Sequence, residues 1–107
     1  MNLPKIVTEL ISAQNKFDSV AYANCFAPNA LVFDDGEDFR GRKEIKNWIA
    51  SANEKYKAVM DPVSYTATAA SGTLSVNVSG NFPGSPAILK YHFEFVDGLI
   101  QSLKVTG

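Results

Sequence analysis

The hydrophobic pattern of this chain changes once, after Lys55, and that change decides the fold class. Before it, apolar residues recur at helical spacing, as in Ile45, Trp48 and Ile49. Beyond it, apolar and polar residues alternate, which is the period of a strand. Helices that precede a run of hairpin strands indicate an α+β fold, since a parallel α/β sheet would need the two patterns to alternate. We therefore expect three helices packed on a strongly curved, mostly antiparallel sheet.

The first half of the chain is expected to hold those three helices and one short strand. A helix follows Pro4 and ends near residue 15, and a second helix, with Asp18 as its N-cap, runs to about Phe26. Residues 30–33 form a short apolar strand, and the acidic residues 34–38 have the composition of a turn. The third helix follows Gly41.

The second half is expected to be strands joined by tight turns. We predict strands over residues 56–70, 73–78, 87–96 and 99–106, with a bend at 61–62 in the first of them. Ser71-Gly72 and Asp97-Gly98 are the expected turns. On the strand 87–96, alternation places Tyr91 and Phe93 on one face and His92 on the other.

Composition narrows the class of protein. The 107 residues form one domain, 46% of them are hydrophobic, and the net charge is −1 with both signs spread along the chain. Nucleic-acid and anionic-membrane surfaces need clustered Lys and Arg, so neither partner is expected. The single cysteine, Cys25, is expected to be a small core residue. One histidine and the absence of phosphate-loop motifs predict no metal and no cofactor, and we expect a cytoplasmic protein.

Several segments resemble one known superfamily. They are Phe26-Ala27-Pro28-Asn29-Ala30, then Asp34, then Gly41 with Ile45 and Trp48 behind it, and Phe93 to Ile100. Their order is similar to that of the nuclear-transport-factor-2-like superfamily, which includes ketosteroid isomerase and the SnoaL-like polyketide cyclases. The resemblance implies a cone-shaped, cystatin-like roll that dimerises through its sheet. It implies no single reaction, because the family holds both enzymes and non-enzymes.

Asp34 is the first candidate for chemistry. It ends the short strand, and by resemblance it falls on the catalytic base of ketosteroid isomerase. A carboxylate on an apolar pocket wall can have a raised pKa and carry protons, whereas a turn-initiating Asp would accept backbone N–H bonds. The enzyme's two donor positions hold Leu10 and Tyr91 here, so only Tyr91 could donate a hydrogen bond.

The concave side of such a sheet predicts an apolar ligand pocket. We expect five residues to line it: Leu10, Tyr22, Trp48, Tyr91 and Phe93. One function is the binding of a small apolar molecule without turnover. Another is an isomerase, cyclase or dehydratase that uses Asp34 as acid and base, and a third is a structural dimer with a filled interior.

Two groups of charged residues are not expected to bind a metal or to take part in catalysis. The acidic turn around Asp34 is read as solvated, since its spacing does not match a calcium loop. Arg40 and Arg42 are expected to neutralise those acids, although beside a helix N-terminus they could also bind an anionic ligand.

Overall fold

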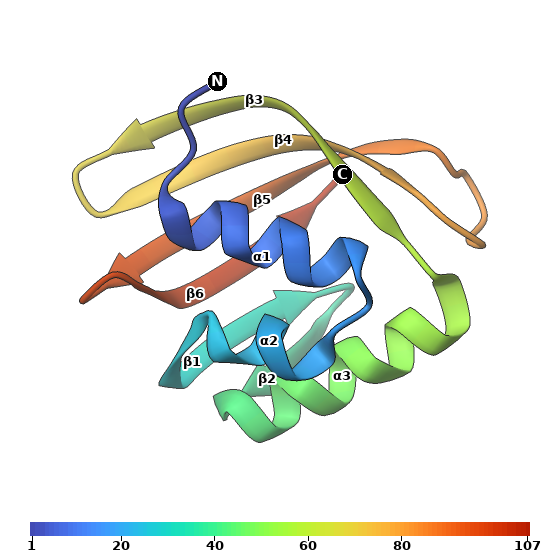
Figure 1. The fold of residues 1–107 in the computed structure, drawn as a ribbon, viewed down its shortest axis with the longest axis horizontal. Coiled ribbons are helices and arrows are strands. Elements are labelled where there is room, and N and C mark those ends of the chain that lie inside the picture. The colour runs from blue at the N-terminus through green and yellow to red at the C-terminus, as the bar shows by residue number, and fades with distance from the viewer.

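The computed structural model describes residues 1–107, in which three helices lie against one side of a single sheet (Figure 1). The helices are α1 (Lys5–Asn15), α2 (Ser19–Asn24) and α3 (Gly41–Tyr56). The strands are β1 (Phe26–Asp34), β2 (Glu37–Arg40), β3 (Val59–Thr68), β4 (Ser71–Ser79), β5 (Ala87–Val96) and β6 (Leu99–Thr106). The predicted α+β class, with three helices on a curved sheet, is confirmed.

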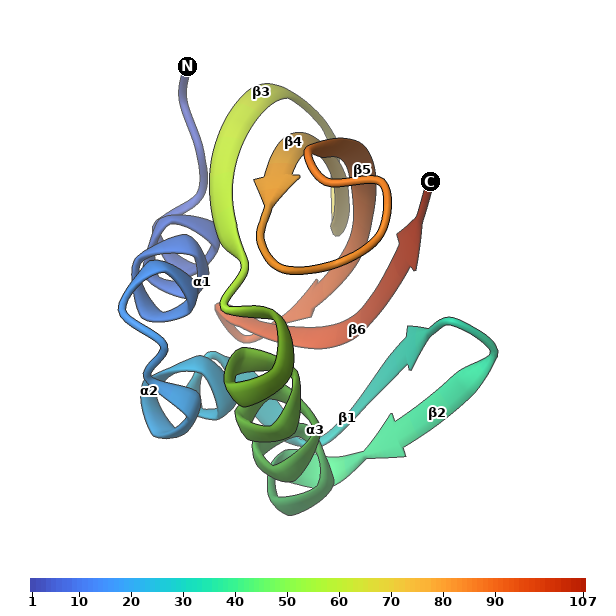
Figure 2. The same ribbon diagram turned by 90° about the vertical axis from the view of Figure 1, so that its right-hand side faces the viewer.

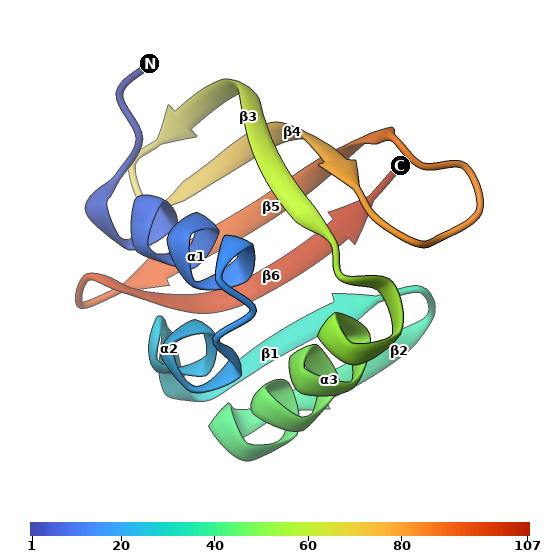
Figure 3. The ribbon, with the colours of Figure 1, turned by 45° about the vertical axis from the view of Figure 1, so that its right-hand side comes forward.

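The six strands lie in the order β2-β1-β6-β5-β4-β3. Every neighbouring pair is antiparallel except β1 and β6, which run parallel. Figure 2 shows the sheet bending strongly, so that β3 curls over toward α1 while β1 and β2 extend away from it. Figure 3 shows α2 and α3 in front of β1, and the two helices contact each other there. The concave face of the sheet therefore looks onto the helices.

The helix boundaries follow from local chemistry. Pro4 occupies the N-cap of α1, where its missing N–H removes no helical hydrogen bond. Asp18 caps α2 as predicted, since its carboxylate accepts the Ala21 N–H at 3.0 Å. The Glu44 carboxylate accepts the Arg40 N–H at 2.9 Å across the first turn of α3. At the other end of α3, Lys57 adopts the left-handed conformation that ends many helices.

Several predictions of boundaries and turns were wrong. The second helix ends at Asn24, and the first strand begins at Phe26 instead of residue 30. This strand tolerates Pro28 because its pairing with β6 is irregular between Phe26 and Leu31. The acidic segment contains a further strand, β2, whose four residues pair with β1.

A further error concerns Gly72, which lies inside β4 opposite Ala67 and not in a turn. The chain turns two residues earlier, at residues 69–70. A side chain at Gly72 would collide with the ring of Tyr65 on β3, so the missing Cβ makes room for that ring. The bend predicted at residues 61–62 is present, as a shift of the β3–β4 register between Pro62 and Ser64.

The core fills the space between the helices and the concave face. Its largest fully buried side chains include Tyr22, Phe26, Phe93, Leu10 and Ile45. No helix is long and apolar enough to cross a membrane.

Candidate functional site

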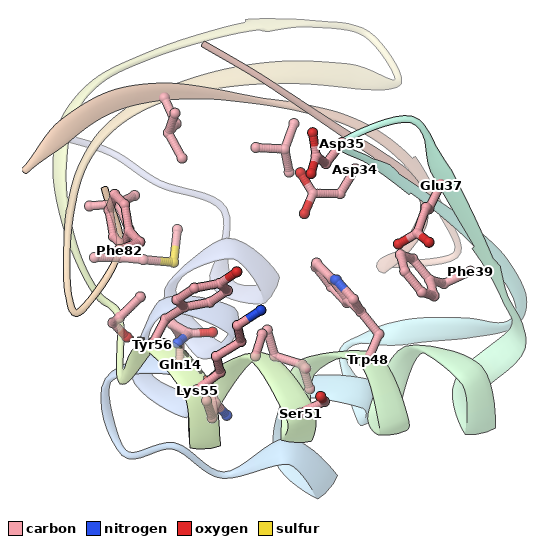
Figure 4. Close-up of a pocket in the computed structure, with 18 of the residues that line it drawn as sticks. Gln14, Asp34, Asp35, Glu37, Phe39, Trp48, Ser51, Lys55, Tyr56 and Phe82 are labelled. Carbon is pink, nitrogen blue, oxygen red and sulfur yellow. Dashed lines mark hydrogen bonds between the residues drawn. The ribbon is translucent and has the colours of Figure 1, made fainter. Parts of the chain in front are cut away.

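A cavity of about 770 Å³ lies between α3 and the concave face of the sheet. It is lined by 21 residues, of which 12 are hydrophobic, so its wall is mixed in character. Figure 4 shows Trp48, Ser51 and Lys55 of α3 on one side and Asp34 facing them from the opposite wall. Strand β5 contributes Tyr91.

A tight hairpin holds Asp34 in place. Asp34 ends β1 and pairs with Glu37 of β2. The two residues between them, Asp35 and Gly36, have φ angles of 52° and 77°, as a two-residue Asp-Gly hairpin turn requires. The Asp34 carboxylate accepts none of the hydrogen bonds expected of a turn-initiating Asp, and burial raises its pKa, helped by the like charges of Asp35 and Glu37. It is therefore an unpartnered carboxylate on the cavity wall.

The charge of Asp34 acts on two buried tyrosines. Burial raises the pKa of Tyr91, and the charge of Asp34 raises it further. Burial also raises the pKa of Tyr22, with smaller contributions from Tyr91 and Asp34. Both hydroxyls consequently stay protonated at neutral pH and can act as hydrogen-bond donors.

A pair of buried amides forms another part of the wall. The Gln14 side chain of α1 donates through Nε2 to the backbone oxygen of Ala58 at 2.7 Å and to Oδ1 of Asn53 at 2.9 Å. A carbonyl can only accept, so the Ala58 contact fixes which atom of Gln14 is the nitrogen, and this in turn fixes the amide of Asn53. Asn53 Nδ2 is left buried without a partner, and Gln14 Oε1 has no donor.

Aromatic rings supply much of the remaining wall. Trp48 stacks on Phe39 of β2, with ring centres 5.2 Å apart and planes inclined by 23°. Tyr56 meets Phe82 edge to face at 6.2 Å. Phe82 lies in the loop after β4, which the Asn81 N–H fastens to the Tyr56 carbonyl at 2.7 Å. Two aromatic pairs thus border the cavity, one at the middle of α3 and one at its C-terminal end.

The five predicted pocket residues separate into two groups. Trp48 and Tyr91 line the cavity together with Asp34. Leu10, Tyr22 and Phe93 do not, because each is no more than 1% exposed within the core. Helical and strand periodicity identifies an inward side chain but does not distinguish a residue at a cavity from one packed beneath it.

Other charged and polar residues also have clear positions. His92 lies on the outer face, where Nε2 is 2.9 Å from Thr106 Oγ1 and Nδ1 is 3.4 Å from Thr73 Oγ1.

The expectation that the two arginines neutralise the acidic turn was wrong. Arg42 Nε donates instead to the Phe26 carbonyl at 2.8 Å, and no ion pair joins either arginine to an acid. No cluster of three His, Cys, Asp or Glu side chains could hold a metal ion.

Gln14 lines the cavity but was not among the predicted pocket residues. A signal was present, since Gln14 lies four residues after Leu10 and continues the buried stripe of α1. A polar side chain on such a stripe needs a buried hydrogen-bond partner. The lining residues Phe39 and Phe82 gave no comparable signal, because they come from a hairpin and a loop.

Comparison with known proteins agrees with this fold. No family model and no curated protein matches the sequence. Among solved structures, a candidate polyketide cyclase from Sinorhizobium meliloti is 35% identical, with 97% of this chain and 95% of that chain covered and a TM-score of 0.93. A Catenulispora acidiphila protein with a ketosteroid isomerase-like fold, in complex with trimethylamine, is 18% identical with a TM-score of 0.89, and the match covers 99% of this chain and 87% of that chain. An NTF2-like protein of unknown function from Cytophaga hutchinsonii is 18% identical with a TM-score of 0.80, and the match covers 94% of this chain and 85% of that chain.

Proposed function

The chain belongs to the nuclear-transport-factor-2-like superfamily, and on that premise we propose that it binds a small, mostly apolar molecule in the cavity beside α3. The observation that carries the proposal is the cavity itself. Its volume of about 770 Å³ lies in the range of small-molecule sites, and its wall combines aromatic rings with a few polar groups. Such a wall offers apolar area for affinity and Asp34, Tyr91 and Gln14 for orientation.

Trp48 provides a direct test, because it is the only tryptophan and it lines the cavity. A ligand that enters will change the environment of the indole ring and hence its fluorescence emission. We expect a panel of small aromatic and alicyclic compounds to give saturable changes in Trp48 emission, together with a rise in the unfolding temperature. If no compound produces either response, the binding proposal fails.

Two alanines of α3 offer a matched control. Ala52 lines the cavity, whereas Ala50 is exposed on the other side of the same helix. Ala52→Phe should fill part of the cavity and weaken binding at least about tenfold, which corresponds to about 1.4 kcal/mol. Ala50→Phe should leave binding unchanged. Equal binding by the two variants would show that the ligand lies elsewhere.

A second candidate function is acid–base catalysis by Asp34 on a small hydrophobic substrate, as in an isomerase, cyclase or dehydratase. The raised pKa of this carboxyl and the presence of Tyr91 in the lining of the same cavity favour it. Asp34 would remove a proton from a carbon beside a carbonyl, while Tyr91 donates to the oxygen where charge develops.

That candidate has a simple assay. Exchange of the α-hydrogens of 2-tetralone in D₂O can be followed by proton NMR with and without the protein. Catalysed exchange that is lost in Asp34→Asn, while Trp48 still reports ligand entry, would support it. Exchange at the same rate with either protein would rule out Asp34 as the base.

A further inference from the structure

The charges around the cavity are unbalanced. Its charged lining residues are four carboxylates, belonging to Asp34, Asp35, Glu37 and Glu44, and one ammonium group, that of Lys55. The chain as a whole has a net charge of only −1, so this excess of negative charge is a property of the cavity. An anionic ligand would enter against it, and a cationic ligand would be attracted.

Most of these carboxylates lack a partner within the protein. Glu44 is occupied by the Arg40 N–H, but no ion pair or hydrogen bond engages the carboxylates of Asp34, Asp35 or Glu37. The single ion pair of the molecule, Lys5 with Glu9 at 4.0 Å, lies on α1 away from the cavity. In Figure 4, the Asp34 and Asp35 side chains lie together on the wall opposite α3. Unpaired charges beside an apolar space are available to a ligand.

The rings of the wall suit the same kind of ligand. A cation is attracted to the face of an aromatic ring, and most strongly to tryptophan. The ammonium group of Lys55 already lies 5.1 Å from the centre of the Tyr56 ring. Trp48 lies on the same helix between the acidic hairpin and Tyr56, as Figure 4 shows. The wall of the cavity therefore carries both carboxylates and aromatic rings.

An unpartnered acceptor on the wall adds an independent observation. Gln14 is only 5% exposed, and the Ala58 and Asn53 oxygens occupy both hydrogens of its amide nitrogen. Its oxygen has no donor, and in Figure 4 it lies on the cavity side of the amide. A carbonyl oxygen on the cavity wall that accepts no hydrogen bond within the protein can accept one from an N–H or O–H group of a ligand.

From these observations we propose that the cavity selects organic cations: molecules with an apolar body that carry a protonated amine. The amine would lie beside Asp34, with Asp35 and Glu37 at the rim, and the apolar body against Trp48. A second N–H or O–H group on a longer ligand would reach Gln14. This inference rests on the proposed function and names the ligand class for the same site.

A set of three nearly isosteric ligands tests it: 2-naphthylmethylamine, 2-naphthalenemethanol and 2-naphthoate. Their dissociation constants are measured by Trp48 emission where the optical overlap allows and by calorimetry for all three, at pH 7 and low salt. We expect the amine to bind at least about tenfold more tightly than the alcohol, or about 1.4 kcal/mol, and the carboxylate to bind most weakly. The preference for the amine should shrink as salt is added.

Matched variants locate the source of the preference. Asp34→Asn should reduce the amine-to-alcohol ratio to within about threefold, which is about 0.65 kcal/mol. Asp38→Asn removes the same charge from the same hairpin but outside the cavity lining, so it should leave the ratio unchanged. Lys55→Gln removes the only cation of the lining and should raise the ratio.

The possible results distinguish the preference for cations from small-molecule binding itself. Equal binding of all three ligands, or tightest binding of the carboxylate, would overturn the cation inference and leave small-molecule binding intact. An amine preference that survives both Asp34→Asn and Glu37→Gln would also overturn it, because the named carboxylates would not be its cause. If calorimetry detects binding of none of the three and the wider panel also fails, both proposals are wrong.

Discussion

Replacing Gln14 by leucine should destabilise the protein far more than replacing its partner Asn53. Gln14→Leu removes the donors to the Ala58 oxygen at 2.7 Å and to Asn53 Oδ1 at 2.9 Å. Each buried polar group left without a partner costs about 1–3 kcal/mol, and the leucine side chain returns part of this as apolar burial. We expect the free energy of unfolding to fall by about 3 kcal/mol, a large share of the roughly 5–15 kcal/mol typical of a domain.

Asn53→Leu has a different balance. Asn53 Nδ2 is already buried without a partner, so the substitution removes an existing penalty together with the bond from Gln14. Gln14 keeps its bond to Ala58. We expect a loss below about 1 kcal/mol, because an unsatisfied group disappears as another is created. In the double variant neither leucine leaves a hydrogen-bonding group of the other position without a partner. Its loss of unfolding free energy should therefore be about 1–2 kcal/mol smaller than the sum of the two single losses.

Urea unfolding at 25 °C, followed by far-ultraviolet circular dichroism, gives all four free energies of the cycle. The orientation assigned to the two amides predicts both the unequal single costs and the coupling. Equal losses for the two single variants would refute that orientation. Costs that add to within about 0.5 kcal/mol would show that the two side chains do not interact.

Four further predictions concern other parts of the molecule. The pKa of Asp34 is higher in the folded state than its ordinary value of 3.8, so the protonated carboxyl stabilises the fold at low pH, and this contribution is lost as pH rises through the folded pKa. Asp34→Asn should therefore be more stable than the parent at pH 7 and lose that advantage in acid, which urea midpoints measured against pH will show. Gly72→Ala should lower stability by about 1–3 kcal/mol because its methyl group meets the ring of Tyr65, and in a Tyr65→Leu background thermal unfolding should show a smaller loss. Burial, with a smaller effect of Glu9, raises the pKa of the Cys25 thiol to about 11, so iodoacetamide should modify the folded protein at pH 8 much more slowly than the urea-unfolded protein. Sedimentation at tens of micromolar protein should detect the homodimer expected through the outer face of the sheet, and a single monomeric species would contradict it.

Periodicity predicted the regular parts of the fold. The boundaries of β5 and β6 agree with the prediction, because alternation is strong there and Asp97-Gly98 marks the turn, with φ angles of 50° and 77°. Strand β2 was missed because it is a four-residue edge strand with charged residues at three positions, a pattern that also describes a solvated turn. Gly72 was misplaced because its role depends on Tyr65, a neighbour across the sheet that local sequence does not identify.

The candidate site was predictable only in part. Asp34 could be singled out because it ends an apolar strand and falls, by resemblance, on the catalytic base of ketosteroid isomerase, and the hairpin places it on the cavity wall. The separation of Trp48 from Leu10 could not be predicted, since both occupy inward positions on helices and only the curvature of the sheet decides which one faces empty space. The pairing of Gln14 with Asn53 joins residues 39 positions apart, so no local pattern could reveal it.

The parallel pairing of β1 with β6 also bears on how the molecule is made. Phe26 lies opposite Ile100 and Val32 opposite Leu103, so the strand that ends in Asp34 has its inner neighbour roughly seventy residues further along the chain. During synthesis, α1, α2, α3 and the β3–β4 hairpin can form from nearby residues, whereas the β1–β2 hairpin lacks its neighbour in the sheet until β6 emerges. Contacts between such distant segments form slowly because a long loop must close first. The cavity is therefore among the last features of the molecule to appear, and a nascent chain that lacks β6 exposes the apolar side of β1 to whatever lies near the ribosome.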